Sequence, residues 1–304
     1  MILTLVSAAC MLALGAPIDT TVSVERGQRL EVNSFGGDIT VKVWARNAVR
    51  VQADPSSRTE ISVTSSGSTV SVRTQGRRGP SSSVDLDLTV PAWMALDLSG
   101  VYTDVHVDGS RGPVAVETVQ GDVEVSGGEG QISLSSVQGS VTLRNAKGRI
   151  EVHSVNQDVR VATTSGEIKA ETVNGEIVLD KVDATNLDAS TVNGDVEYDG
   201  PIHDGGRYAL SSHNGDITIA VAPTANAAVG VSTFGGDFES DFPVTMTEGR
   251  KGKRFSFTLG KGGGAQIELE SFQGTIRLAR PGTVSHRESK DHDEDEDDHG
   301  HDEN

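Results

Sequence analysis

Acidic residues at regular intervals are the first feature of this 304-residue sequence that could support chemistry. Each follows a glycine, or in one place a glutamine, and they are Asp122, Asp158, Glu176, Asp195, Asp216 and Asp237. Carboxylates at matching positions of neighbouring chain segments could share a Ca²⁺ ion, which prefers about six to eight oxygen ligands. The calcium-binding nonapeptide reads G-G-x-G-x-D, however, whereas this sequence has one glycine–acid pair in about eighteen residues. We therefore expect exposed, solvated carboxylates rather than a calcium ladder.

The C-terminal tail, residues 281–304, is a second candidate for metal binding. Between His286 and Asn304 it holds ten acidic and two basic residues and no apolar residue to bury, so it is expected to be disordered. Histidines among carboxylates can chelate Zn, Ni or Cu ions. The candidate ligands are His292, Asp297, His299 and His301. Metal affinity should be weak because no fold holds these ligands in place, and the alternative interpretation is a tail that only keeps the protein soluble.

Catalytic motifs were not found, and we expect no enzyme. There is no G-x-S-x-G, H-E-x-x-H or P-loop sequence, and Gly260–Gly264 lacks the Lys-Ser/Thr pair that a P-loop needs. The histidines before the tail are scattered and are interpreted as surface residues: His106, His153, His203 and His213. A polysaccharide-acting enzyme, which needs acids gathered on one face, is kept as a minor alternative. The formal charge of −18 argues against nucleic acid as a partner.

An internal repeat positions these residues. Glycine recurs every nine residues from Gly112 to Gly175, with Gln157 at one of the places. With the glycine as position one, positions three and five are aliphatic in all eight copies. Apolar residues at alternate positions are typical of a β-strand with one buried face, and they exclude a helix.

Odd and even copies differ, so the full coil has eighteen residues. Odd copies end in Ser/Thr-Val-Gln/Asn-Gly-acid, as in Thr118–Asp122 and Thr191–Asp195, and an earlier copy stands at Ser34–Ile39. Glycine suits the corner because it adopts positive φ, and stacked copies place Val and Ile in inner ladders and Asn and Gln in an outer amide ladder. We predict an all-β fold, a parallel β-solenoid of the β-helix or β-roll type with about 18–21 residues per coil. Residues 99–280 should form roughly nine or ten coils, in a rod about 45 Å long.

The segments before the coils have different patterns. Residues 16–98 alternate as short strands between turn-rich stretches, which favours an antiparallel N-terminal β cap. Trp44, Trp93 and the Phe residues are interpreted as packing inside the caps. Residues 1–15 are apolar and end in small residues, so we expect a signal peptide that leaves Ala16 as the first mature residue. A buried N-terminal strand is the alternative.

Cys10 is the single cysteine, and Ser7–Cys10 is loosely similar to a lipoprotein processing site. Lipid anchoring through Cys10 is therefore a less favoured alternative to simple export. No other segment is apolar for eighteen residues, so no transmembrane segment is expected in the mature chain.

Several motifs together resemble the bacterial DUF4097 family of adhesin-like β-strand-repeat proteins. They are the S/T-V-N-G-D-I/V repeat, the block Gly37–Trp44, the bridge Val90–Ala92 and the closing Ser271–Ile276, and the resemblance covers about residues 20–280. It implies an exported or envelope-associated β-solenoid of undefined biochemistry. We expect a non-catalytic structural, adhesive or interaction surface that is periplasmic, cell-surface or secreted and needs no cofactor. Its expected partners are envelope or extracellular proteins or glycans, and the alternative is an exported protein that binds divalent metal ions.

Overall fold

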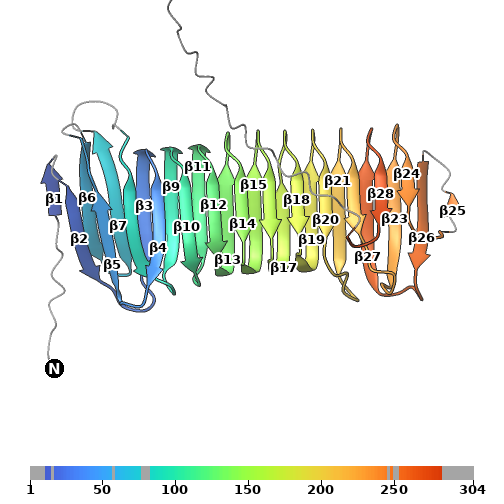
Figure 1. Cartoon of the computed structure of the whole chain (residues 1–304), viewed down its shortest axis with the longest axis horizontal. Coiled ribbons are helices and arrows are strands. Elements are labelled where there is room, and N and C mark those ends of the chain that lie inside the picture. The colour runs from blue at the N-terminus through green and yellow to red at the C-terminus, as the bar shows by residue number, and fades with distance from the viewer. Residues whose placement is uncertain are drawn as a thin grey trace, which may run out of the picture.

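The computed structural model describes residues 11–14, 17–56, 59–76, 83–244, 247–248 and 253–282. Over these residues the elements are all β-strands, arranged in a fifteen-stranded sheet (sheet A) and a thirteen-stranded sheet (sheet B). Figure 1 shows them as a straight rod with the strands running across its long axis. The predicted all-β parallel solenoid is confirmed.

Each coil contributes one strand to each sheet. In the middle of the rod, the strands of sheet A are β9 (Ala95–Tyr102), β11 (Val114–Gln120), β13 (Glu129–Ser136), β15 (Lys147–Ser154), β17 (Ser165–Glu171), β19 (Asp183–Thr191) and β21 (Arg207–Ser212). Those of sheet B are β10 (Val105–Ser110), β12 (Val123–Gly127), β14 (Val141–Arg144), β16 (Val159–Ala162), β18 (Ile177–Asp180), β20 (Val196–Asp199) and β22 (Ile217–Ala220). Every strand pairs in parallel with its counterpart one coil away, for example Val123 with Val141 and Val141 with Val159.

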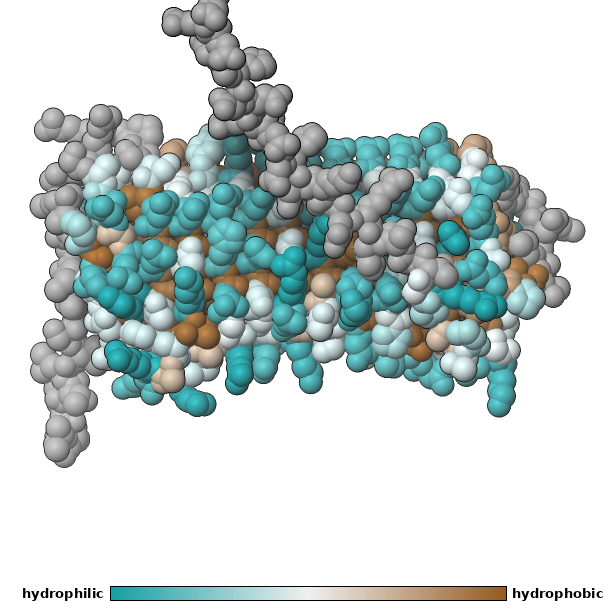
Figure 2. All heavy atoms as spheres, viewed as in Figure 1, coloured by the Kyte–Doolittle hydropathy of each residue, from teal (hydrophilic) through white to brown (hydrophobic). Residues whose placement is uncertain are grey.

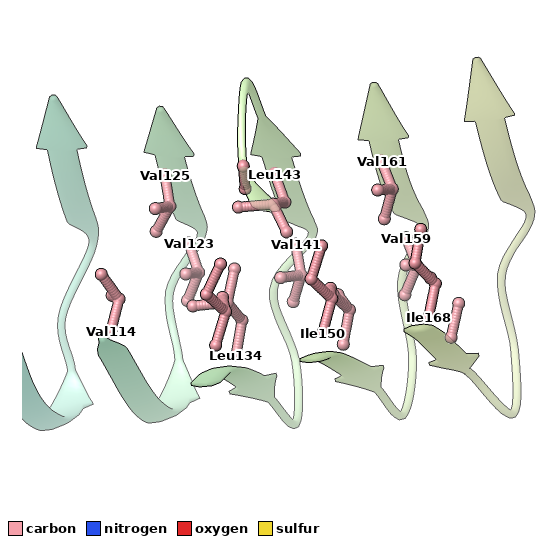
Figure 3. Packing of buried hydrophobic residues seen from close by; sticks show 14 of the residues in the cluster. Val114, Val123, Val125, Leu134, Val141, Leu143, Ile150, Val159, Val161 and Ile168 are labelled. Atoms are coloured by element: carbon pink, nitrogen blue, oxygen red, sulfur yellow. The ribbon is translucent and has the colours of Figure 1, made fainter. Parts of the chain in front are cut away.

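The core lies between the two sheets and consists of the aliphatic residues that the repeat placed at positions three and five. Figure 3 shows Leu134 and Ile150 of sheet A pointing toward Val141 and Val159 of sheet B. All four side chains are fully buried. Because one coil cannot bury this face alone, the apolar stabilisation comes from the stacking of neighbours. Figure 2 shows the opposite character outside, where hydrophilic residues cover most of the visible face.

The N-terminal end combines antiparallel and parallel pairing. Its strands are β1 (Met11–Leu14), β2 (Ile18–Ser23), β3 (Arg29–Gly36), β4 (Ile39–Trp44), β5 (Ala48–Ala53), β6 (Thr59–Ser66), β7 (Thr69–Gly76) and β8 (Leu86–Pro91). The pairs β2–β5, β5–β8 and β6–β7 are antiparallel. The coil β3/β4 is parallel to both of its neighbours and lies between the β7/β8 coil and the β9/β10 coil. Parallel stacking therefore starts within residues 16–98, and the early motif copy at Ser34–Ile39 belongs to it.

The expected signal peptide, Cys10 included, lies mostly outside the described residues. Its described part, Met11–Leu14, forms β1, which pairs antiparallel with β6. The described residues contain no apolar helix of membrane-spanning length.

The C-terminal end also departs from sequence order. Its strands are β23 (Ala227–Thr233), β24 (Phe238–Ser240), β25 (Thr247–Glu248), β26 (Lys253–Leu259), β27 (Ala265–Ser271) and β28 (Ile276–Ala279). The last coil, β27/β28, is inserted between the β21/β22 coil and the β23/β24 coil and is parallel to both. The hairpin strand β26 then covers β23 in the antiparallel sense. Nine coils fall within residues 95–280, as the repeat count predicted.

Candidate interaction surface

The hydroxyl side chains that recur in the repeat join one coil to the next. The Ser136 hydroxyl donates to the Gly121 carbonyl at 2.9 Å and accepts from the Gly139 N–H at 2.8 Å. Ser212 donates in the same way to the Gly194 carbonyl at 2.8 Å. Both hydroxyls are buried, and each one finds a hydrogen-bond partner in a corner carbonyl of the neighbouring coil.

The carboxylates that follow the corner also bind backbone. Asp122 accepts the N–H of Ser140 at 2.7 Å, and Asp158 accepts the N–H of Glu176 at 2.9 Å. Most of these acids are exposed, but Asp158 and Glu176 are half-buried. Burial, together with the neighbouring charges of Glu197 and Asp158, raises the pKa of Glu176 above its ordinary value. The repeated acid is thus a hydrogen-bond acceptor for the next coil.

Metal binding stays a prediction. Among the described residues no group of three or more His, Cys, Asp or Glu side chains is placed to hold a metal ion. The candidate ligands His292, Asp297, His299 and His301 lie outside the described residues. Calorimetric titration of Zn²⁺ into the full chain and into a chain without residues 286–304 tests the tail, which should account for all the binding.

Asparagines one coil apart form the amide ladder that the sequence predicted. Asn174 donates to Asn156 at 3.1 Å, Asn193 to Asn174 at 2.7 Å, and Asn214 to Asn193 at 2.8 Å. The side-chain amides of Asn174 and Asn193 each use one N–H and the oxygen in the ladder, so the second N–H of each amide can donate to a partner outside the chain. The corner therefore presents a row of hydrogen-bond donors with the period of the strands.

Beside the amides runs a second row that the sequence did not identify as exposed, which we call the corner ladder. In stacking order its members are Phe35, Val101, Val119, Val137, Val155, Val173, Val192, His213, Phe272 and Phe234. From Val119 onward each carbonyl accepts the N–H of the residue that follows the next member, as in Gln138 to Val119 at 3.0 Å and Gly235 to Phe272 at 2.8 Å. At the other end, Gly36 pairs with Tyr102 and Gln120 with Tyr102, which places Phe35, Val101 and Val119 side by side.

The corner ladder is apolar except for His213, and its members are exposed apart from Val101 and Val155, which are half-buried. Val119 is 47% exposed and Val192 is 41% exposed, and Phe234 at the end of the row reaches 71%. The rings of His213, Phe272 and Phe234 stack with centroid distances of 4.7 and 4.9 Å. The interpretation of the Phe residues as buried cap packing was therefore wrong for Phe35, Phe234 and Phe272. Aromatics do pack at the C-terminal end, where Phe238 contacts Phe255 and Phe257.

The outer face of sheet A has a shallow hollow of about 730 Å³ over β21, β27, β23 and β26. Small residues form its floor because Ala209, Gly230 and Ser256 lie on either side of the longer Glu268. Arg254 and Glu270 also line it, so the hollow carries charges of both signs. It could hold a polar side chain or a sugar ring of a larger partner.

The four histidines before the tail lie at separate places along the rod. His106 is 3.6 Å from Glu124, whereas His203 contacts Asp183 and its backbone N–H donates to the Tyr208 hydroxyl at 2.9 Å. Tyr208 and Tyr198 are fully buried at this point, and both hydroxyls donate to backbone carbonyls. Burial raises the pKa of both phenols. The tyrosine pair thus anchors the loop between β20 and β21.

This chain is similar to a family of known proteins over most of its length. Residues 27–279 match the family model described as Toastrack DUF4097. No curated protein sequence matches the chain. Among solved structures, a protein from Clostridium sporogenes described as a candidate cell adhesion protein is 10% identical, and the likeness covers 87% of this chain and 99% of that one with a TM-score of 0.24.

Proposed function

The chain belongs to the Toastrack DUF4097 family, and on that premise we propose that it is a non-catalytic, exported β-solenoid that offers an extended binding surface in the cell envelope. The observation that carries the proposal is the use of the repeat residues. The hydroxyls that recur in the motif donate to the backbone of the preceding coil, and the carboxylates accept from the backbone of the next coil. Because the motif residues hold the coils together, they build a rigid rod, and the outward faces of that rod are available to bind a partner.

The hollow on sheet A is the part of these faces best suited to a partner. Its floor of small residues lets a partner approach the backbone, and Arg254, Glu268 and Glu270 supply donors and acceptors at its sides. This combination supports a polar partner, either a protein loop or a glycan of the envelope. Export is supported by the apolar residues 1–15, which would be removed before the rod reaches its site of action.

Binding of the full chain to isolated bacterial envelopes tests the proposal. We expect the chain to co-sediment with envelopes and Glu268→Lys to weaken that binding at least tenfold, because it reverses a charge inside the hollow. Glu239→Lys is the matched control, since Glu239 is exposed on β24 of sheet B, away from the hollow. Equal binding by both variants would reject the hollow as the site, and absence of binding by the unsubstituted chain would reject the function.

The cellular location is tested separately by fractionation and by the mass of the processed chain. We expect a chain that begins at Ala16 and appears in the envelope or the medium. An unprocessed chain in the cytoplasm would contradict export.

A further inference from the structure

We propose that the corner ladder is a self-association surface, on which a second copy of this chain docks with its rod antiparallel to the first. The twofold axis passes between the coils of Val155 and Val173. This inference goes beyond the proposed function and does not depend on it, because it rests on the corner ladder, which lies along an edge and meets the hollow on sheet A only at Ser211, Ser232 and Glu270.

The first support is the shape and charge of the row. None of its ten members is an acid, Lys or Arg, and neither is any residue that directly follows them: Gly36, Tyr102, Gln120, Gln138, Asn156, Asn174, Asn193, Asn214, Gln273 and Gly235. Figure 1 shows that the rod is straight, so the row forms one continuous line. In a chain with a net charge of −18, a line of this length that holds no acid, Lys or Arg and is apolar except for His213 is a patch of the kind that marks an interaction site.

The second support is the order of residues within the row, which is nearly the same read from either end. Phenylalanine stands at both ends, and next to it comes a valine that adjoins Tyr102 at one end and a second phenylalanine at the other. The six middle members are valines, except for His213. A twofold axis at the centre therefore pairs identical residues in three of the five pairs and a valine with an aromatic ring in the other two. The pairs across the axis are Phe35 with Phe234, Val101 with Phe272, Val119 with His213, Val137 with Val192, and Val155 with Val173. A second rod also has the same strand spacing, so every pair along the row can meet at once.

The third support comes from the residues on either side of the row. The antiparallel arrangement places the amide ladder against itself, and Asn156 then faces Asn174 of the other copy. Each amide oxygen has a second lone pair that can accept an N–H group left over by the other ladder. On the other side of the row, the outward residues two positions before each ladder member face one another across the axis without placing like charges together. His153 faces Glu171 across the axis, while Glu117 faces Ser211 and Glu270 faces Ser99, so no two acids oppose each other there. A parallel arrangement, with its twofold axis along the rod, would instead set the amide side of one copy against the Glu117 side of the other.

The contact area sets the strength that we expect. Nine strand spacings of about 4.8 Å and a width of about 10 Å give roughly 430 Å² per copy. Stable interfaces bury about 800 Å² per copy, so this dimer belongs to the weak class that depends on concentration. Each copy also carries a net charge of −18, so salt should strengthen the association by screening repulsion between the rods.

Sedimentation equilibrium of the full chain over a series of concentrations provides the first test. We expect a reversible monomer–dimer equilibrium, and we expect Val173→Asp to raise the dissociation constant at least tenfold because the axis places the buried carboxylate in the interface twice. Val178→Asp is the matched control, since Val178 lies in the same coil but on the outward face of sheet B. Circular dichroism checks that both variants fold. A monomer at every concentration, or a dimer unaffected by Val173→Asp, would overturn the proposal.

Disulfide trapping tests the orientation. In a Cys10→Ser background, a mixture of the Val137→Cys chain and the Val192→Cys chain should cross-link, because the axis brings these two positions together. The Val137→Cys chain alone should not, since its two copies lie about three strand spacings, or roughly 14 Å, apart and a disulfide needs Cα atoms within about 7 Å. Cross-linking of Val137→Cys with itself would mean a parallel dimer and would refute the inference. A monomer whose ladder variants lose binding to a polysaccharide would likewise refute it, in favour of a glycan.

Discussion

Replacing one corner glycine by alanine should cost far more than the same change elsewhere in the rod. A Cβ at position 139 would lie 1.8 Å from the carbonyl oxygen of Gly121 in the coil before it. At position 230, in contrast, a Cβ has nothing within 4 Å. Gly139→Ala and Gly230→Ala therefore make a matched pair in which the same methyl group meets backbone at one site and open space at the other.

The size of the effect follows from the bonds around the corner. To give the new methyl an ordinary contact, the two coils must separate locally by more than about 1 Å, since close packing places such atoms roughly 3.5 Å apart. That movement strains the bonds from Ser136 to Gly121, from Gly139 to Ser136, and from Ser140 to Asp122, which are 2.9, 2.8 and 2.7 Å long. At about 1 kcal/mol for each bond, Gly139→Ala should lower the free energy of unfolding by about 3 kcal/mol. Gly230→Ala should change it by less than about 1 kcal/mol, and in the stabilising direction, because alanine restricts the unfolded chain.

One corner of this rod already carries a side chain at the glycine position. Where Gln157 takes the place of glycine, the bond from its N–H to the Ser154 hydroxyl is 3.3 Å, against 2.8 Å at Gly139. The rod therefore tolerates a side chain at the cost of weaker bonds, which is why we expect destabilisation rather than loss of the fold. Urea denaturation followed by circular dichroism measures both variants. Equal stability of Gly139→Ala and Gly230→Ala would refute the argument that backbone approach dictates glycine at the corner.

Three further predictions concern other parts of the rod. Thr163 has a φ of 53°, which a β-branched residue tolerates poorly. Thr163→Gly should therefore raise the free energy of unfolding by about 1 kcal/mol, and a lower melting temperature of this variant would contradict the prediction. The pKa of Glu176 is raised in the folded chain above its ordinary value of 4.5, so the folded state loses stability as the pH rises and this carboxyl ionises. Glu176→Gln should therefore raise the melting temperature near neutral pH and leave it unchanged below pH 4.5. Ending the chain after residue 264 removes an inner coil and should make the segment from β21 onward sensitive to proteolysis, whereas ending it after residue 282 should leave the protease pattern of the rod unchanged.

The solenoid could be predicted from the sequence because one periodic pattern indicates both the strands, through alternating apolar residues, and the length of the coil, through the spacing of the repeats. Apolar residues at positions three and five are possible in every copy only if all copies point the same face inward, and Ile150 and Val159 are indeed fully buried. The amide ladder could also be predicted, because identical residues at a fixed spacing must stack once the coils do. Asn174 and Asn193 confirm it.

The reason for glycine at the corner could not be read correctly from sequence. We expected positive φ, and Gly121 does have a φ of 143°. Gly139 and Gly175, however, lie outside the left-handed region, and what they share with Gly121 is a carbonyl oxygen of the preceding coil close to the missing Cβ. Such an approach depends on how the next coil is placed, which no local pattern encodes.

The exposed row and the order of the terminal coils were also beyond sequence reasoning. Val119 is 47% exposed and Val116 only 3%, because Val116 points inward along β11 whereas Val119 points outward where the strand reaches the corner. Likewise, the motif at Ser271–Thr275 is equivalent to all the others, so any coil could accept it as a neighbour. The hairpin formed by β25 and β26 and the long step before Gly274 let β27 turn back and pair with β21.

The displaced coils at both ends change how such a molecule can lengthen or shorten over evolution. An open-ended array can gain or lose repeat units at its ends. In this rod, however, each end contains a coil that is inserted out of sequence order, β3/β4 at the N-terminal end and β27/β28 at the C-terminal end. A unit added beyond either end would find its docking position already taken. Duplication or loss of whole eighteen-residue units is compatible with the fold only in the interior, so relatives of different size should share both ends and differ in the number of coils between them.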